Sequence, residues 1–162
     1  MKKQGFRFPL GIWIVLATVI IPGLLGVVGG QALSFFAWDV ALSLGLQEDH
    51  PESTDVVELT MGAVSWGEAI TDTLVQGTLV IVTLIGILRQ RQYGYVAGMA
   101  LYALWVYVTM MATFQRVGLY QWGLVSDFSR LKSVGIPMAI FWGIPGIISI
   151  ICLKANRSFF SD

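Results

Sequence analysis

The chain alternates between long apolar stretches and short polar ones, and four of the apolar stretches are long enough to cross a membrane. A hydrocarbon core of about 30 Å requires roughly 17–25 residues of α-helix. We therefore predict an antiparallel four-helix membrane bundle, folded as one domain over 1–162. The predicted spans cover about 9–30, 63–88, 93–115 and 136–153, with outer loops at 31–62 and 116–135.

Two stretches of the outer loops are apolar but too short to span. Gln31–Leu46 either extends the first helix or lies at the membrane interface, where Phe35, Phe36 and Trp38 would suit the headgroup region. Leu119–Phe128 has enough apolar positions for a second surface helix. We expect short interfacial helices in these two places.

The N-terminal segment has two interpretations. Its basic start, followed by an apolar run, fits a cleaved signal peptide as well as a first span. The run 9–30 is longer than the ~7–15 apolar residues of a signal sequence, so we expect a retained helix. Pro22 lacks a backbone N–H and is expected to kink that helix.

Composition supports the bilayer as solvent and excludes several classes of site. The chain is 12% charged, whereas soluble domains carry roughly 25%, and its mean hydropathy is +0.73. The single Cys152 excludes an internal disulfide, and the single His50 excludes a multi-histidine metal or haem site within one chain. No nucleotide-binding loop, nucleophile elbow or basic nucleic-acid face is present. We predict no metal, no cofactor and no nucleic-acid partner, and leave catalysis open.

The basic residues are distributed unevenly over the loops. Short cytoplasmic loops carry an excess of Lys and Arg, so this asymmetry predicts orientation. With both termini in the cytoplasm of a plasma or bacterial inner membrane, nine of the ten acidic residues lie on the outer side. The basic residues then on the cytoplasmic side are Lys2, Lys3, Arg7, Arg89, Arg91, Lys154 and Arg157.

The second predicted helix carries a polar stripe that enters the membrane. At 100° per residue the stripe occupies an arc of about 80°. Its members are Glu58, Ser65, Glu68, Asp72, Gln76 and Thr83. Counting about 20 residues outward from Arg89 places Glu68 at the hydrocarbon boundary and Asp72 about one turn inside it. Carboxylates at such depth usually mark function; alternatively they are partly hydrated and only cap the bundle.

The third predicted helix has a matching stripe that includes Tyr102, Trp105, Thr109 and Arg116. Arg116 should reach the depth of Glu68, and its guanidinium is suited to pairing with a carboxylate. Such a pair would either satisfy both groups structurally or leave the second carboxylate free to bind a ligand or a proton.

Two functions remain open from these patterns. Acidic and aromatic side chains together favour a small hydrophobic or cationic ligand, a lipid or an ion, bound in an outward-facing pocket. The alternative is a non-catalytic accessory or assembly subunit in which the polar stripe is an interhelical seam. With either function the predicted partners are the lipid bilayer and, in addition, a second copy of the chain or a partner membrane subunit. The candidate ligand-binding residues are Asp72, Glu68, Arg116, Trp66, Tyr102, Trp105, Thr109 and Gln76.

Overall fold

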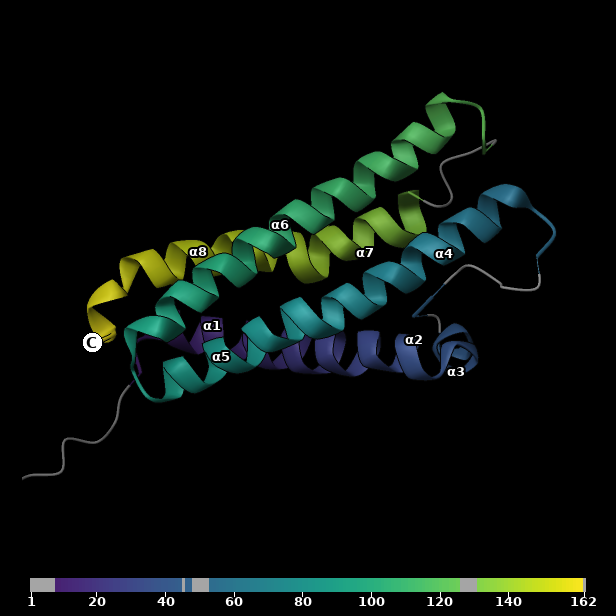
Figure 1. Ribbon diagram of the computed structural model, residues 1–162. Helices are drawn as coiled ribbons and strands as arrows, with labels where there is room; N and C mark the ends of the chain where they lie inside the picture. The colour runs from purple at the N-terminus through teal and green to yellow at the C-terminus, as the bar shows by residue number, and fades with distance from the viewer. Residues whose placement is uncertain (1–7, 45, 48–52, 126–130, 162) are drawn as a thin grey trace, which may run out of the picture.

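The computed structural model describes residues 8–44, 46–47, 53–125 and 131–161. Over these residues the chain is helical apart from short connections (Figure 1). Four of its helices are long and apolar enough to cross a membrane, which confirms the predicted all-helical fold with four long apolar helices and fits a small multi-pass membrane protein. They run from Leu10 to Phe36, Val56 to Leu88, Gln92 to Gln121 and Lys132 to Ala155.

The first span is one continuous helix that is longer than the uncharged run alone indicated. It consists of α1 (Leu10–Thr18), the π-helical stretch η1 (Val19–Gln31) and α2 (Ala32–Phe36). Pro22 lies inside η1, where its missing N–H excludes a regular α-helical hydrogen bond. The helix ends at Ala37, whose φ of −148° and ψ of 68° are not helical, and α3 (Trp38–Ser43) follows as a separate short helix. The first helix therefore extends as far as Phe36, and the position of α3 at the membrane interface stays a prediction.

The second span is also continuous and contains a π-helical turn at its acidic residues. It consists of α4 (Val56–Thr71), η2 (Asp72–Gln76) and α5 (Gly77–Leu88). Asp55 caps its first turn, because its carboxylate accepts hydrogen bonds from the backbone N–H of Val57 at 2.7 Å and of Glu58 at 3.4 Å. Single π-helical turns are frequent at functional sites.

The third span is the single helix α6 (Gln92–Gln121). It continues past residue 115, where the predicted span ended, so Arg116 lies on the helix and the outer loop begins later than expected. The acidic loop around His50 and the stretch from residue 126 to 130 lie outside the described residues.

The fourth span comprises η3 (Leu131–Gly135), α7 (Ile136–Met138), η4 (Ala139–Gly143) and α8 (Ile144–Ala155), and η5 (Arg157–Phe159) follows it.

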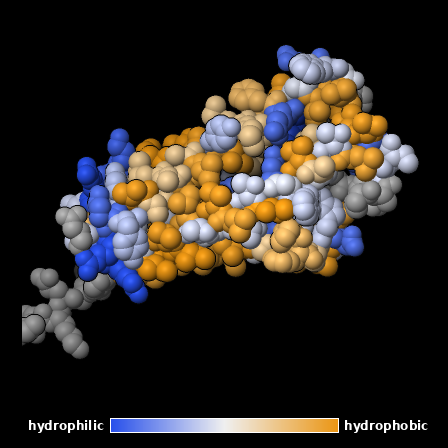
Figure 2. Space-filling model, viewed as in Figure 1, coloured by the Kyte–Doolittle hydropathy of each residue, from blue (hydrophilic) through white to orange (hydrophobic). Residues whose placement is uncertain are grey.

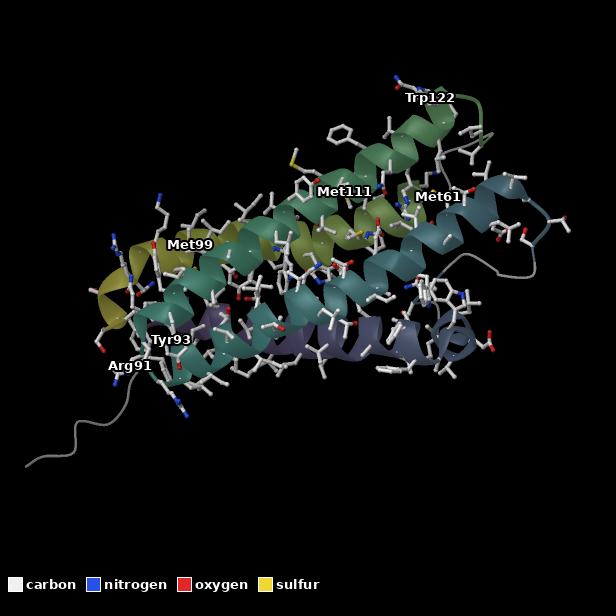
Figure 3. All side chains as sticks on the ribbon, in the orientation of Figure 1. Met61, Arg91, Tyr93, Met99, Met111 and Trp122 are labelled. Atoms are coloured by element: carbon white, nitrogen blue, oxygen red, sulfur yellow. The ribbon has the colours of Figure 1, made fainter. Side chains whose placement is uncertain are left out.

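One end of the bundle is closed by the connection between α5 and α6 and by the C-terminal segment. We call it the inner end, in keeping with the predicted orientation, and Figure 2 shows hydrophilic residues gathered there. Gly86 and Gly94 bring the backbones of α5 and α6 into contact, because a Cβ on either would meet the other glycine. The backbone N–H of Ser161 donates to the carbonyl of Gln90 at 2.8 Å, and Gln92 N–H donates to the carbonyl of Ser161 at 2.8 Å. Arg91 and Tyr93 mark this connection in Figure 3.

The opposite, outer end is more loosely assembled. There α4 packs on α2, whereas α6 packs on the fourth span through η3 and η4. Helices α4 and α6 diverge toward this end (Figure 1). The bundle is therefore tight at the inner end and separates at the outer end, where the polar stripes lie.

Candidate functional site

The polar residues inside the bundle form two separate groups. The first group, which we call the inner seam, consists of Thr18, Tyr102 and Ser149 on three different spans. The Tyr102 hydroxyl lies 2.7 Å from Thr18 Oγ1 and donates to the carbonyl of Val15 at 3.1 Å. Thr18 Oγ1 in turn lies 2.9 Å from Ser149 Oγ. Every hydroxyl of the inner seam thus has a partner on another helix, as buried polar groups require.

The second group surrounds a cavity of about 350 Å³ in the outer half of the bundle, which we call the outer cavity. All four spans contribute to its lining. Its apolar side includes Val27 from η1 and Met138, Phe141 and Trp142 from the fourth span. The residues of the two predicted stripes that line it are Ser65, Glu68, Asp72, Gln76, Trp105 and Arg116.

Within the described part of the chain, neither carboxylate of the outer cavity forms an ion pair with a cationic side chain. Gln76, which is 3% exposed, donates from Nε2 to Asp72 Oδ1, one turn away on the same span. Arg116 Nη1 donates to Gln115 Oε1 at 3.0 Å, and among the described residues no ion pair joins Arg116 to Glu68 or Asp72. The predicted Arg–carboxylate contact is therefore absent here, although the three charges share one cavity.

Trp105 adds an unused hydrogen-bond donor to this group. Its side chain is 1% exposed and lines the outer cavity, and its ring meets that of Tyr102 edge-on at 5.2 Å between centroids. Among the described residues, Nε1 of Trp105 has no hydrogen-bond acceptor. A buried indole N–H normally finds a partner, so this donor sets Trp105 apart from the hydroxyls of the inner seam.

Three other predicted residues lie elsewhere. Tyr102 belongs to the inner seam. Thr109 donates to the carbonyl of Met138 at 3.4 Å and packs on Gly143, so it joins α6 to the fourth span. Trp66 is 48% exposed and its ring lies 6.0 Å from that of Phe35. None of the three is among the described residues that line the outer cavity.

The structure also brings residues to the cavity that the helical stripes did not indicate. Gln31, Gln47 and Ser133 contribute polar groups from the first span, the loop after it and the fourth span. Gln31 is a polar residue in an otherwise apolar helix, and this is the sequence signal that could have identified it as a cavity residue. Stripes identify a face within one helix and do not specify which face of another helix lies opposite.

Comparison with known proteins gives no further constraint on the site. No family model matches the chain, and no curated protein or solved structure matches it significantly. Within the described part of the chain, no group of three or more His, Cys, Asp or Glu side chains is placed to hold a metal ion. The chemistry that the outer cavity offers is thus that of two carboxylates, one guanidinium, amide groups and indole rings in a low-dielectric setting.

Proposed function

We propose that the protein binds a small molecule with a single positively charged, ammonium-type group in the outer cavity. The observation that carries this proposal is the position of Glu68 and Asp72 beside one cavity, with neither carboxylate in an ion pair with another described residue. Together with Arg116, the ionised groups leave one net negative charge. A monovalent cation in the cavity would cancel it.

Electrostatics favours such a ligand strongly at this depth. At 1.5 Å per residue, Asp72 lies about 24 Å along the helix from Leu88 at the inner end, which is inside a ~30 Å core. Unbalanced charge inside a bilayer is costly. A cation 4 Å from a carboxylate gains about 4 kcal/mol at an effective dielectric constant of about 20. Binding of a cationic ligand would thus lower this electrostatic cost.

The remaining lining residues suit an organic cation better than a bare metal ion. Trp105 and Trp142 present indole rings, and an ammonium group over an indole face gains about 0.5–2 kcal/mol. Trp105 Nε1 is available to an acceptor on the ligand. The volume of about 350 Å³ lies within the usual range of small-molecule sites, roughly 300–1,000 Å³.

An accessory subunit with a purely structural seam is the competing function. It would require Glu68 and Asp72 to be satisfied across helices, as the hydroxyls of the inner seam are. The hydrogen bond of Asp72 instead stays on its own span, with Gln76. The geometry therefore favours binding.

The test is a calorimetric titration of butylammonium into the protein in detergent micelles. We expect saturable binding that weakens at least tenfold in Asp72→Asn, since tenfold corresponds to about 1.4 kcal/mol and one charge contact exceeds this. The matched control is Asp39→Asn, because Asp39 is an exposed acid in the first turn of α3, away from the cavity. The proposal is wrong if the wild-type protein shows no saturable binding, or if Asp72→Asn and Asp39→Asn bind equally well.

A further inference from the structure

The outer cavity lies between two helices that do not close over it. Residues of α4 and α6 line it from both sides, yet these two helices are not packed closely against each other. Each is held by a different neighbour, α4 by α2 and α6 by the fourth span. Figure 1 shows α4 and α6 diverging along their outer halves.

The surface on this side has a polar recess within an apolar surround. Figure 2 shows hydrophilic atoms in a hollow between the surfaces of α6 and α4, with hydrophobic residues on both flanks. The exposed apolar side chains of these two helices include Val64 on α4, 39% exposed, and Phe114 on α6, 65% exposed. A membrane protein normally covers polar groups on its lipid-facing side, so polar residues in such a recess favour an occupant that covers them.

Two methionines lie at the border of this recess. Figure 3 shows Met61 on α4 and Met111 on α6 on either side of the space between the two helices. Both side chains are partly exposed. Methionine is unbranched and flexible, so this pair can adapt to an apolar chain that passes between them.

We propose that the ligand is a membrane-dissolved amphiphile, with an ammonium head and a single apolar chain, that enters sideways from the outer leaflet between α4 and α6. The inference rests on the proposed binding function and adds the route and the chemical class. The head reaches Glu68 and Asp72 through the recess. The chain stays in the recess between Met61 and Met111 and continues into lipid. A polar amine from the aqueous phase is the other source of the same head group, and the experiment separates the two.

The test uses dodecylammonium with a diazirine halfway along its chain, added to the protein in phosphatidylcholine nanodiscs and photolysed at increasing times. We expect crosslinks on the α4 and α6 residues that flank the recess, competed by unmodified dodecylammonium but not by dodecanol. Met111→Trp narrows the recess and should slow labelling at least fivefold. Met110→Trp is the matched control, because Met110 is the adjacent residue on α6, is 54% exposed and does not line the cavity.

Equilibrium titration with butylammonium accompanies each variant and reports whether the cavity itself is intact. Unchanged butylammonium binding with slowed dodecylammonium labelling only in Met111→Trp supports the lateral route. Equal labelling rates in the two variants, or crosslinks away from α4 and α6, overturn it while leaving the proposed binding function in place. Absence of butylammonium binding to the wild-type protein overturns both.

Discussion

The inner seam and the outer cavity both contain polar side chains inside the bundle, but they differ in how these side chains are paired across helices. In the inner seam, hydroxyls from three spans meet and each has a partner on another helix. Glu68, Asp72 and Trp105 all line the outer cavity, and among the described residues neither carboxylate nor the indole N–H has such a cross-helix partner. The difference shows that depth and polarity alone do not mark a site. Under the proposed function, the missing cross-helix partners at the outer cavity are what leave its polar groups available to a ligand.

The largest loss of stability is expected from adding a side chain at the Gly86–Gly94 contact, which closes the inner end. Gly86→Ala places a Cβ against the backbone of Gly94, which cannot move aside as a side chain can. We expect loss of at least about 3 kcal/mol of unfolding free energy, or failure to fold. Gly67→Ala is the matched control, since a Cβ at Gly67 meets nothing within 4 Å. Unfolding followed by circular dichroism in detergent measures both, and equal stability of the two variants would contradict a tight inner end.

A smaller loss of stability should follow from removing one hydroxyl of the inner seam. Tyr102→Phe deletes the bonds to Thr18 and to the carbonyl of Val15 without changing the ring. Interhelical hydrogen bonds in membrane proteins contribute about 0.6–2 kcal/mol, and we expect a loss in this range with unchanged butylammonium affinity. Tyr107→Phe, at a 61% exposed position on the same helix, should change neither. Weaker butylammonium binding in Tyr102→Phe would place the inner seam in the binding site.

Removing the positive charge from the outer cavity should strengthen binding. Arg116→Gln leaves both carboxylates without the nearby guanidinium that competes with a bound cation. We expect butylammonium affinity to rise several-fold, equivalent to about 1 kcal/mol for charges several ångströms apart at an effective dielectric constant of about 20. The calorimetric titration described for Asp72→Asn measures it. Weaker binding in Arg116→Gln would mean that Arg116 holds the carboxylates in place for the ligand.

Asp72→Asn should change stability the least of these variants, although it should weaken ligand binding strongly. Asp72→Asn removes one of two like charges and retains an oxygen that can accept the hydrogen bond from Gln76. Because no cross-helix partner is lost, we expect the unfolding free energy to stay within about 1 kcal/mol of the wild-type value. A loss of the size expected for breaking a buried ion pair, about 3–5 kcal/mol, would identify the stripe as a structural seam instead.

The sequence predicted the spans and the polar stripe of the second helix well, because both depend on periodicity within one segment. The end of the third span was predicted too early, since Arg116 marks the limit of the uncharged run and not of the helix. Arginine is a good helix former, and backbone hydrogen bonds continue to Gln121.

The sequence did not predict which residues of the third-helix stripe line the outer cavity and which contact other spans. Trp105 and Arg116 line the outer cavity, whereas Tyr102 and Thr109 contact other spans. These side chains share one broad face of α6, and two neighbouring elements divide that face between them. Angular position within a helix carries no information on where the neighbours lie, so this division required the three-dimensional structure.

The most direct test of the account is to measure stability and binding together in the double variant Glu68→Gln/Asp72→Asn. Both substitutions keep side-chain size and hydrogen-bonding groups while removing the two negative charges. The account predicts an unfolding free energy within about 1 kcal/mol of the wild-type value and no detectable butylammonium binding. Retained binding, or a loss of more than about 2 kcal/mol of stability, would contradict the division into a structural inner seam and a ligand-binding outer cavity.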